Sequence, residues 1–165
     1  MKKITIFIFS FVLVSCYDSG NSNTQFQTKK VEIDYQNSVD EFIAKHTATH
    51  DVFEFANNEV VQLAALSCVD ETTTKFSIKT ISKKNENVSE LEGVAILKEG
   101  DVEIDEDEDG IGYPVNEYIY NENCCIAVRL ALESKNLLRI NSAECGDIVT
   151  ESAPFISKGV LKKLN

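Results

Sequence analysis

Short strand-like segments separated by turn residues are the feature that most constrains the fold of this chain. The turns are marked by Asn57-Asn58 and Glu99-Gly100-Asp101, residue types that favour tight turns. Short strands with polar turns between them are typical of antiparallel β domains. The sequence therefore predicts a mostly β fold, a small antiparallel sandwich or barrel. The expected strands are residues 52–55, 75–82, 93–98, 118–120, 124–133 and 137–145.

One short helix is expected at the start of this domain, over residues 38–49. Ser38 is a plausible N-cap, and Glu41 follows it at the capping-box spacing. One helical face would carry the apolar side chains of Val39, Phe42 and Ile43. Residues 59–69 read EVVQLAALSCV and are mostly apolar, a pattern that fits either a buried strand or a short helix.

The amino terminus has the pattern of an export signal. Lys2 and Lys3 precede an apolar run over residues 4–14. A helix of that length reaches only about 16 Å, which is too short for a hydrocarbon core of about 30 Å. A secretory signal is therefore expected here, and not a membrane span.

The end of this segment, Leu13-Val14-Ser15-Cys16, resembles the lipobox of bacterial lipoproteins. The resemblance covers about a tenth of the chain and implies that Cys16 carries a diacylglyceryl group after cleavage before it. It also implies anchoring to the cell envelope, because acyl chains supply the membrane affinity. Tyr17 stands where an Asp would favour inner-membrane retention, which favours the outer membrane in a diderm source.

Composition then divides the chain into three parts. The signal peptide is residues 1–15, the lipidated cysteine and a polar tether are residues 16–30, and one globular domain is expected over residues 31–165. The chain has 16 basic and 27 acidic side chains, a net charge of −11, and loss of Lys2 and Lys3 makes this −13. This charge favours a cationic protein partner and disfavours nucleic acid.

Four cysteines remain if Cys16 is lipidated, and an even number in an exported domain predicts two disulfides. A hairpin turning at residues 134–136, with Asn136 in the left-handed region, places Leu132 opposite Leu138 and Cys125 opposite Cys145. Neighbouring residues of a strand face opposite ways, so Cys124 would lie on the apolar side. We therefore expect the pairs Cys125–Cys145 and Cys68–Cys124. One bridge with free thiols, a vicinal Cys124–Cys125 bond and a metal site are the alternatives.

Residues 99–109 read EGDVEIDEDED, with eight carboxylates in eleven residues. The spacing of Asp105, Asp107 and Asp109 before Gly110 matches the opening of a calcium loop, in which Ile111 would offer its carbonyl. Asn116 stands where an EF-hand has its bidentate Glu. The alternatives are a solvated loop or edge strand and a recognition surface for a basic partner.

Tyr113, Tyr118 and Tyr120 follow the acidic run and could form part of a contact patch, although core or half-buried sheet positions are favoured. His46 and His50 have the spacing of a shared helical face, which favours a surface pair over a metal site.

No motif of a nucleophilic hydrolase, a P-loop or a dinucleotide-binding site is present. We therefore expect a lipid-anchored, non-catalytic binding or inhibitory domain that uses its acidic loop against a basic protein. A calcium-binding structural or adhesive lipoprotein and a small periplasmic or surface hydrolase are the alternatives. No cofactor other than calcium is implied.

Overall fold

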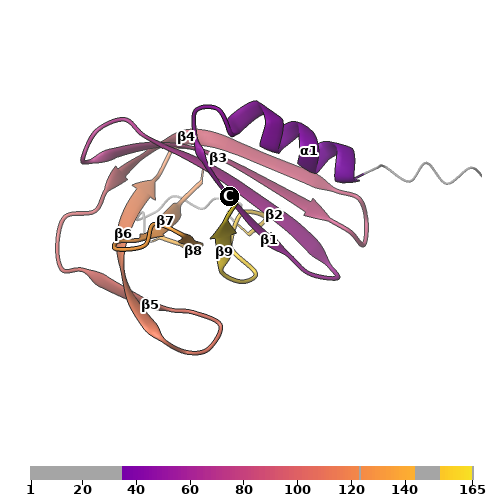
Figure 1. Cartoon of the computed structure of the whole chain (residues 1–165). Helices are drawn as coiled ribbons and strands as arrows, with labels where there is room; N and C mark the ends of the chain where they lie inside the picture. The colour runs from indigo at the N-terminus through magenta and orange to yellow at the C-terminus, as the bar shows by residue number, and fades with distance from the viewer. Residues whose placement is uncertain (1–34, 123, 144–152, 165) are drawn as a thin grey trace, which may run out of the picture. The chain divides into compact units, whose positions relative to one another are not determined.

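Eight antiparallel strands close into a barrel in this protein, seen here in a computed structural model that describes residues 35–122, 124–143 and 153–164 (Figure 1). These residues belong to one compact unit, Glu32–Asn165. The predicted mostly β fold with one short helix is confirmed, and its form is the barrel. The elements are α1 (Tyr35–His46), β1 (Asp51–Ala56), β2 (Val60–Cys68), β3 (Thr73–Ser82), β4 (Val88–Leu97), β5 (Glu103–Glu106), β6 (Gly112–Tyr120), β7 (Ile126–Ala131), β8 (Leu137–Ser142) and β9 (Leu161–Lys163).

The barrel closes at two places that differ from simple hairpins. The strands follow one another in the order β4-β3-β2-β1-β9-β8-β7-β6, and β6 pairs back to β4. That last pairing joins Ile96 to Ile119 and Leu97 to Tyr118. The three-residue strand β9 lies between β1 and β8 and pairs with both. No strand was expected at β9 from the sequence.

Large apolar side chains fill the inside of the barrel. An eight-stranded barrel is just wide enough for its side chains to fill the interior. Phe53, Phe76 and Tyr120 are buried there, and the rings of Phe76 and Tyr120 meet edge to face at 5.1 Å between centroids. Gly93 allows this contact, because a Cβ at that position would lie 2.5 Å from the Tyr120 ring. The interior is therefore a packed core.

A second apolar cluster lies outside the barrel, beneath α1. Val39 and Phe42 of the helix pack on the outward-facing side chains of β1, β2 and β3. In β2 these are Val61, Leu63 and Ala65, whereas Ala64 and Leu66 point into the barrel. Because β2 is buried on both faces, its sequence shows no polar alternation. Of the two structures expected for residues 59–69, the strand is the one observed, over Val60–Cys68.

The predicted elements differ from the observed ones mainly in their limits and register. The helix spans Tyr35–His46, where residues 38–49 were expected. In the β7–β8 hairpin, Leu130 pairs with Leu138 and Val128 with Ile140, so the predicted register is wrong by two residues. A two-residue shift preserves the faces of the strands. The turn is wider than expected, and Lys135, not Asn136, has the left-handed backbone, with φ of 51°.

The predicted Cys68–Cys124 disulfide is wrong, because both cysteines are free thiols. Cys124 does lie on the apolar side, where burial raises the pKa of its thiol. Cys68 instead lines a surface pocket of about 480 Å³ together with Leu130 and Lys135. Cys124 precedes Leu130 by six residues, roughly 20 Å of extended chain. Disulfides need Cα atoms within about 7 Å.

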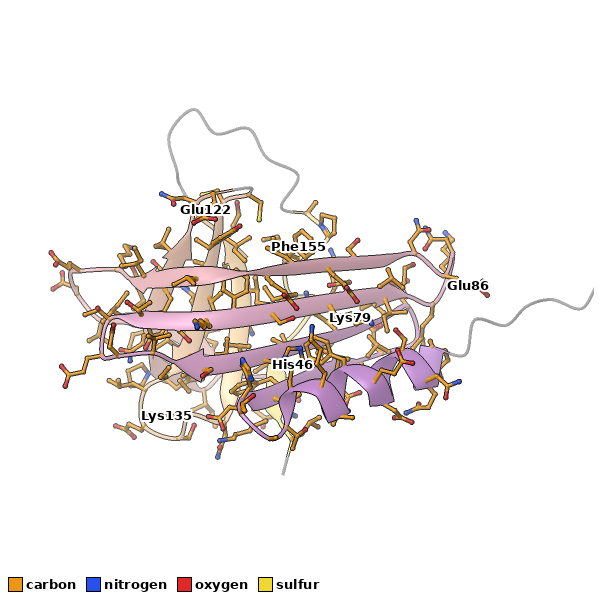
Figure 2. All side chains as sticks on the ribbon, turned by 90° about the horizontal axis from the view of Figure 1, so that it is seen from above. His46, Lys79, Glu86, Glu122, Lys135 and Phe155 are labelled. Carbon is orange, nitrogen blue, oxygen red and sulfur yellow. The ribbon has the colours of Figure 1, made fainter. Side chains whose placement is uncertain are left out.

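In Figure 2, Glu122, which precedes β7, and Lys135, which follows it, lie on opposite sides of the barrel. The shifted register places Ala143 opposite Cys125, since its N–H donates to the Cys125 carbonyl at 3.4 Å. Cys125 is disulfide-bonded. Its predicted partner Cys145 lies outside the described residues, as does the proposed lipidation site Cys16, so both stay predictions.

Within the described ranges, no helix is long and apolar enough to cross a membrane.

Candidate functional site

The acidic run forms a hairpin at the edge of the sheet, which we call the acidic hairpin (residues 102–115). It consists of β5, a turn, and the first half of β6, with Asp105 opposite Tyr113. Asp107 closes the turn, because its Oδ1 accepts the N–H groups of Asp109 and Ile111, each at 2.9 Å. Gly110 supplies the left-handed backbone with φ of 77°. In Figure 1 β5 extends away from α1, beyond β6.

Arg129 of β7 binds the base of the acidic hairpin. Its guanidinium contacts three carboxylates: Asp105 Oδ1 at 2.7 Å, Glu103 Oε2 at 3.4 Å, and Glu117 through Nε. Lys98 also bridges Glu117 and Glu103, at 2.7 and 3.1 Å. The side chains of Arg129, Asp105 and Glu117 are all largely buried. This network of opposite charges joins β5, β6 and β7.

The ionisation of this network follows from its contacts. Burial works to raise the pKa of Glu117, but hydrogen bonds from Lys98 and Arg129 outweigh it and lower the pKa below its ordinary value. Burial and the negative charge of Asp105 raise the pKa of Tyr113. Asp105 retains one buried oxygen, Oδ2, that has no hydrogen-bond partner. Glu117 therefore faces the guanidinium as an anion.

Two further basic side chains contact the acidic hairpin from β8 and β9, which β7 separates from it in the sheet. Arg139 of β8 donates from Nη2 to the Glu106 carbonyl at 2.8 Å. Lys162 of β9 pairs with Glu108 at 2.8 Å, and both of those side chains are mostly exposed. Arg139 pairs with Arg129 across the sheet. We call Arg129, Arg139 and Lys162 the basic row.

The acidic hairpin presents large aliphatic side chains to solvent. Val102, Ile104 and Ile111 are 57%, 61% and 63% exposed. Ile104 alternates with the buried Asp105, so it lies on the opposite face of β5. Three exposed carboxylates, those of Glu106, Glu108 and Asp109, lie between Ile104 and Ile111 in the sequence. The acidic hairpin thus exposes both large aliphatic side chains and carboxylates.

The residues of the expected calcium loop are not brought together as ligands. Asp105 binds Arg129, Asp107 accepts two backbone N–H groups, and Asp109 and Ile111 are exposed. Among the described residues, no group of three or more His, Cys, Asp and Glu is arranged to hold a metal ion. The calcium loop is therefore not formed, whereas the edge-strand interpretation of the run holds for β5.

The tyrosines do not form a contact patch. Tyr118 and Tyr120 are buried in the barrel core, and Tyr113 is half-buried beside Asp105. The favoured interpretation of core and half-buried positions is confirmed, and the contact interpretation is wrong for the two core residues. Their side chains are needed for packing and are inaccessible to a partner.

The two histidines lie together, but they are not a surface pair. His46 is buried against Phe42, and its ring meets that of His50 at 5.0 Å between centroids. His46, labelled in Figure 2, is the last residue of α1. Burial, with the positive charges of Lys45 and His50, lowers the pKa of His46. This arrangement favours a neutral core histidine.

Asp107 gives a direct test of the turn. We expect Asp107→Ala to lower the free energy of unfolding by about 1–2 kcal/mol, because two N–H groups lose their acceptor. Asp107→Asn keeps an oxygen in place and is expected to cost much less. Urea denaturation followed by circular dichroism measures both. Equal losses in the two variants, with a saturable calcium stabilisation of the unsubstituted chain, would instead restore the calcium interpretation.

Arg129, Arg139 and Lys162 were not predicted as site residues. The available signal was Arg129 itself, a single cation between apolar residues of a strand, since a buried cation requires carboxylate partners. Sequence spacing does not show which of the many carboxylates those partners are. Lys162 lies about 54 residues from Glu108, and only the barrel brings them together.

No known protein family, curated protein or solved structure matches this chain.

Proposed function

We propose that this chain is an exported, lipid-anchored, non-catalytic binding or inhibitory domain whose acidic hairpin docks onto a basic protein. The observation that carries the proposal is that the acidic hairpin exposes three large aliphatic side chains together with three carboxylates. An exposed apolar group with a polar rim is typical of a protein-interaction site.

Charge complementarity selects the occupant. A second copy of this chain would bring like charges together, whereas a cationic surface would be attracted and steered to the acidic hairpin. The anchor is proposed at Cys16, at the outer membrane if the source is diderm, on the strength of the lipobox resemblance. The tether of residues 16–30 would then place the domain away from the lipid surface.

The test is capture of envelope proteins on the immobilised chain, followed by binding measurements with each purified candidate. The hairpin variant is Glu106→Gln/Glu108→Gln/Asp109→Asn. The matched control is Glu41→Gln/Glu59→Gln/Glu71→Gln, which removes three exposed carboxylates elsewhere. We expect a basic protein whose affinity falls at least tenfold in the hairpin variant and little in the control.

A second variant separates docking from simple attraction. Ile104→Ser/Ile111→Ser leaves the net charge unchanged and is expected to weaken the same complex, because apolar contact area is lost. Equal binding by the hairpin variant and the control would contradict the proposal. A partner lost with both charge variants and retained by the serine variant would indicate only non-specific attraction to an acidic protein.

A further inference from the structure

The contacts between the basic row and the acidic hairpin are buried at the base of the hairpin and exposed at its tip. At the base, Arg129 and Asp105 have side chains that are only 15% and 8% exposed. At the tip, Lys162 and Glu108 are 62% and 56% exposed. Separating a buried pair leaves an unsolvated charge, whereas separating an exposed pair returns both charges to water. The tip contact is therefore the one that can open while the base stays closed.

Lys162 lies where a cation of a basic partner would be attracted. Its ammonium is held by Glu108, and the charges of Asp109 and Asp107 add to the effect of Glu108 in raising the pKa of Lys162. The tip thus already has one cation bound from within the chain. A carboxylate paired in this way is less available to a second cation.

We infer that Lys162 masks the tip of the acidic hairpin, so that a basic partner must displace Lys162 to use Glu108 while Arg129 keeps the base in place. This inference rests on the proposed function. Lys162 then competes with the partner's cation for Glu108, and binding exchanges one cation for the other. Removing Lys162 should then strengthen binding of a cation, provided that Glu108 is present.

The masking is tested with a fluorescent decalysine peptide and the full chain at low ionic strength. Lys162→Gln is compared with Lys84→Gln, which makes the same charge change at an exposed lysine in the β3–β4 turn. We expect decalysine to bind Lys162→Gln about two- to fivefold more tightly than Lys84→Gln. In the Glu108→Gln background the two lysine variants should bind equally. Equal affinities in the unsubstituted background, or a difference that persists with Glu108→Gln, would overturn the masking.

A titration of Lys162 by nuclear magnetic resonance separates this inference from the proposed function. Glu108→Gln should lower the pKa of Lys162 toward its ordinary value, and Glu41→Gln should not. If the pKa is unaffected by Glu108→Gln, the contact is absent and the masking is wrong, although docking at the acidic hairpin can still stand. If the contact is present but decalysine binds the hairpin variant and its matched control equally, the proposed docking fails and the masking has no target.

Discussion

Leu161→Ala should lower the free energy of unfolding by about 2–5 kcal/mol, the usual cost of truncating a fully buried leucine. Leu161 is completely buried in the barrel core, although its strand has only three residues. The loss should be at the upper end, because β9 is the only connection between β1 and β8 among the described residues. A cavity there weakens both contacts at once.

Leu132→Ala is the control for this measurement. Leu132 is partly exposed, after the end of β7, so its truncation should cost well under half as much. Urea denaturation followed by far-ultraviolet circular dichroism is suitable, since the chain has no tryptophan. Equal losses for the two variants would show that β9 does not close the barrel in solution.

Arg129→Gln is expected to destabilise the protein by about 3–5 kcal/mol at neutral pH, since it leaves buried carboxylates without their cation. Arg129→Lys should lose less, because one charge remains while the forked geometry is lost. Replacing the whole group, as Arg129→Met/Asp105→Asn/Glu117→Gln, should recover part of the loss. A triple variant no more stable than Arg129→Gln would contradict this account.

The loss of stability caused by Arg129→Gln should become smaller at acidic pH. Glu117 has a lowered pKa in the folded protein, so its contribution is fully present above its unfolded pKa, near 4.5, and is lost as the pH falls through the folded value. Arg129→Gln removes one of the hydrogen bonds that lower this pKa. The difference between the two proteins should therefore be constant near neutrality and become smaller below about pH 4.5. A difference that grows with acidification would exclude Glu117 as the linked group.

Local patterns predicted the fold class because the barrel strands follow one another along the chain and most pair with their neighbours. The faces of β7 and β8 were predicted correctly, since matching apolar residues fixes the face of a strand. The register was not, because the turn around Lys135 is wider than a three-residue loop. A two-residue shift satisfies the same faces, so side-chain pattern alone cannot detect it.

The remaining differences come from contacts between distant segments. The double burial of Val60–Cys68 depends on α1, and β9 is a strand only because β1 and β8 lie on either side of it. The sequence identified the acidic run as a candidate surface. The role of Asp105 within that run depends on its pairing with Arg129, and no spacing rule connects these two residues. Sequence therefore located the candidate site, whereas the fold determined which of its carboxylates are paired.

The position of β9 also has a consequence for the kinetics of folding. Phe53 of β1 pairs with Lys163 of β9, a separation of about 110 residues. During synthesis, β1 through β8 emerge from the ribosome before their missing neighbour, and β1 and β8 keep unpaired edges for that interval. Such edges are prone to intermolecular pairing. The barrel therefore cannot be completed before residue 163 has been made. The interval before that point is when this chain is most prone to aggregation.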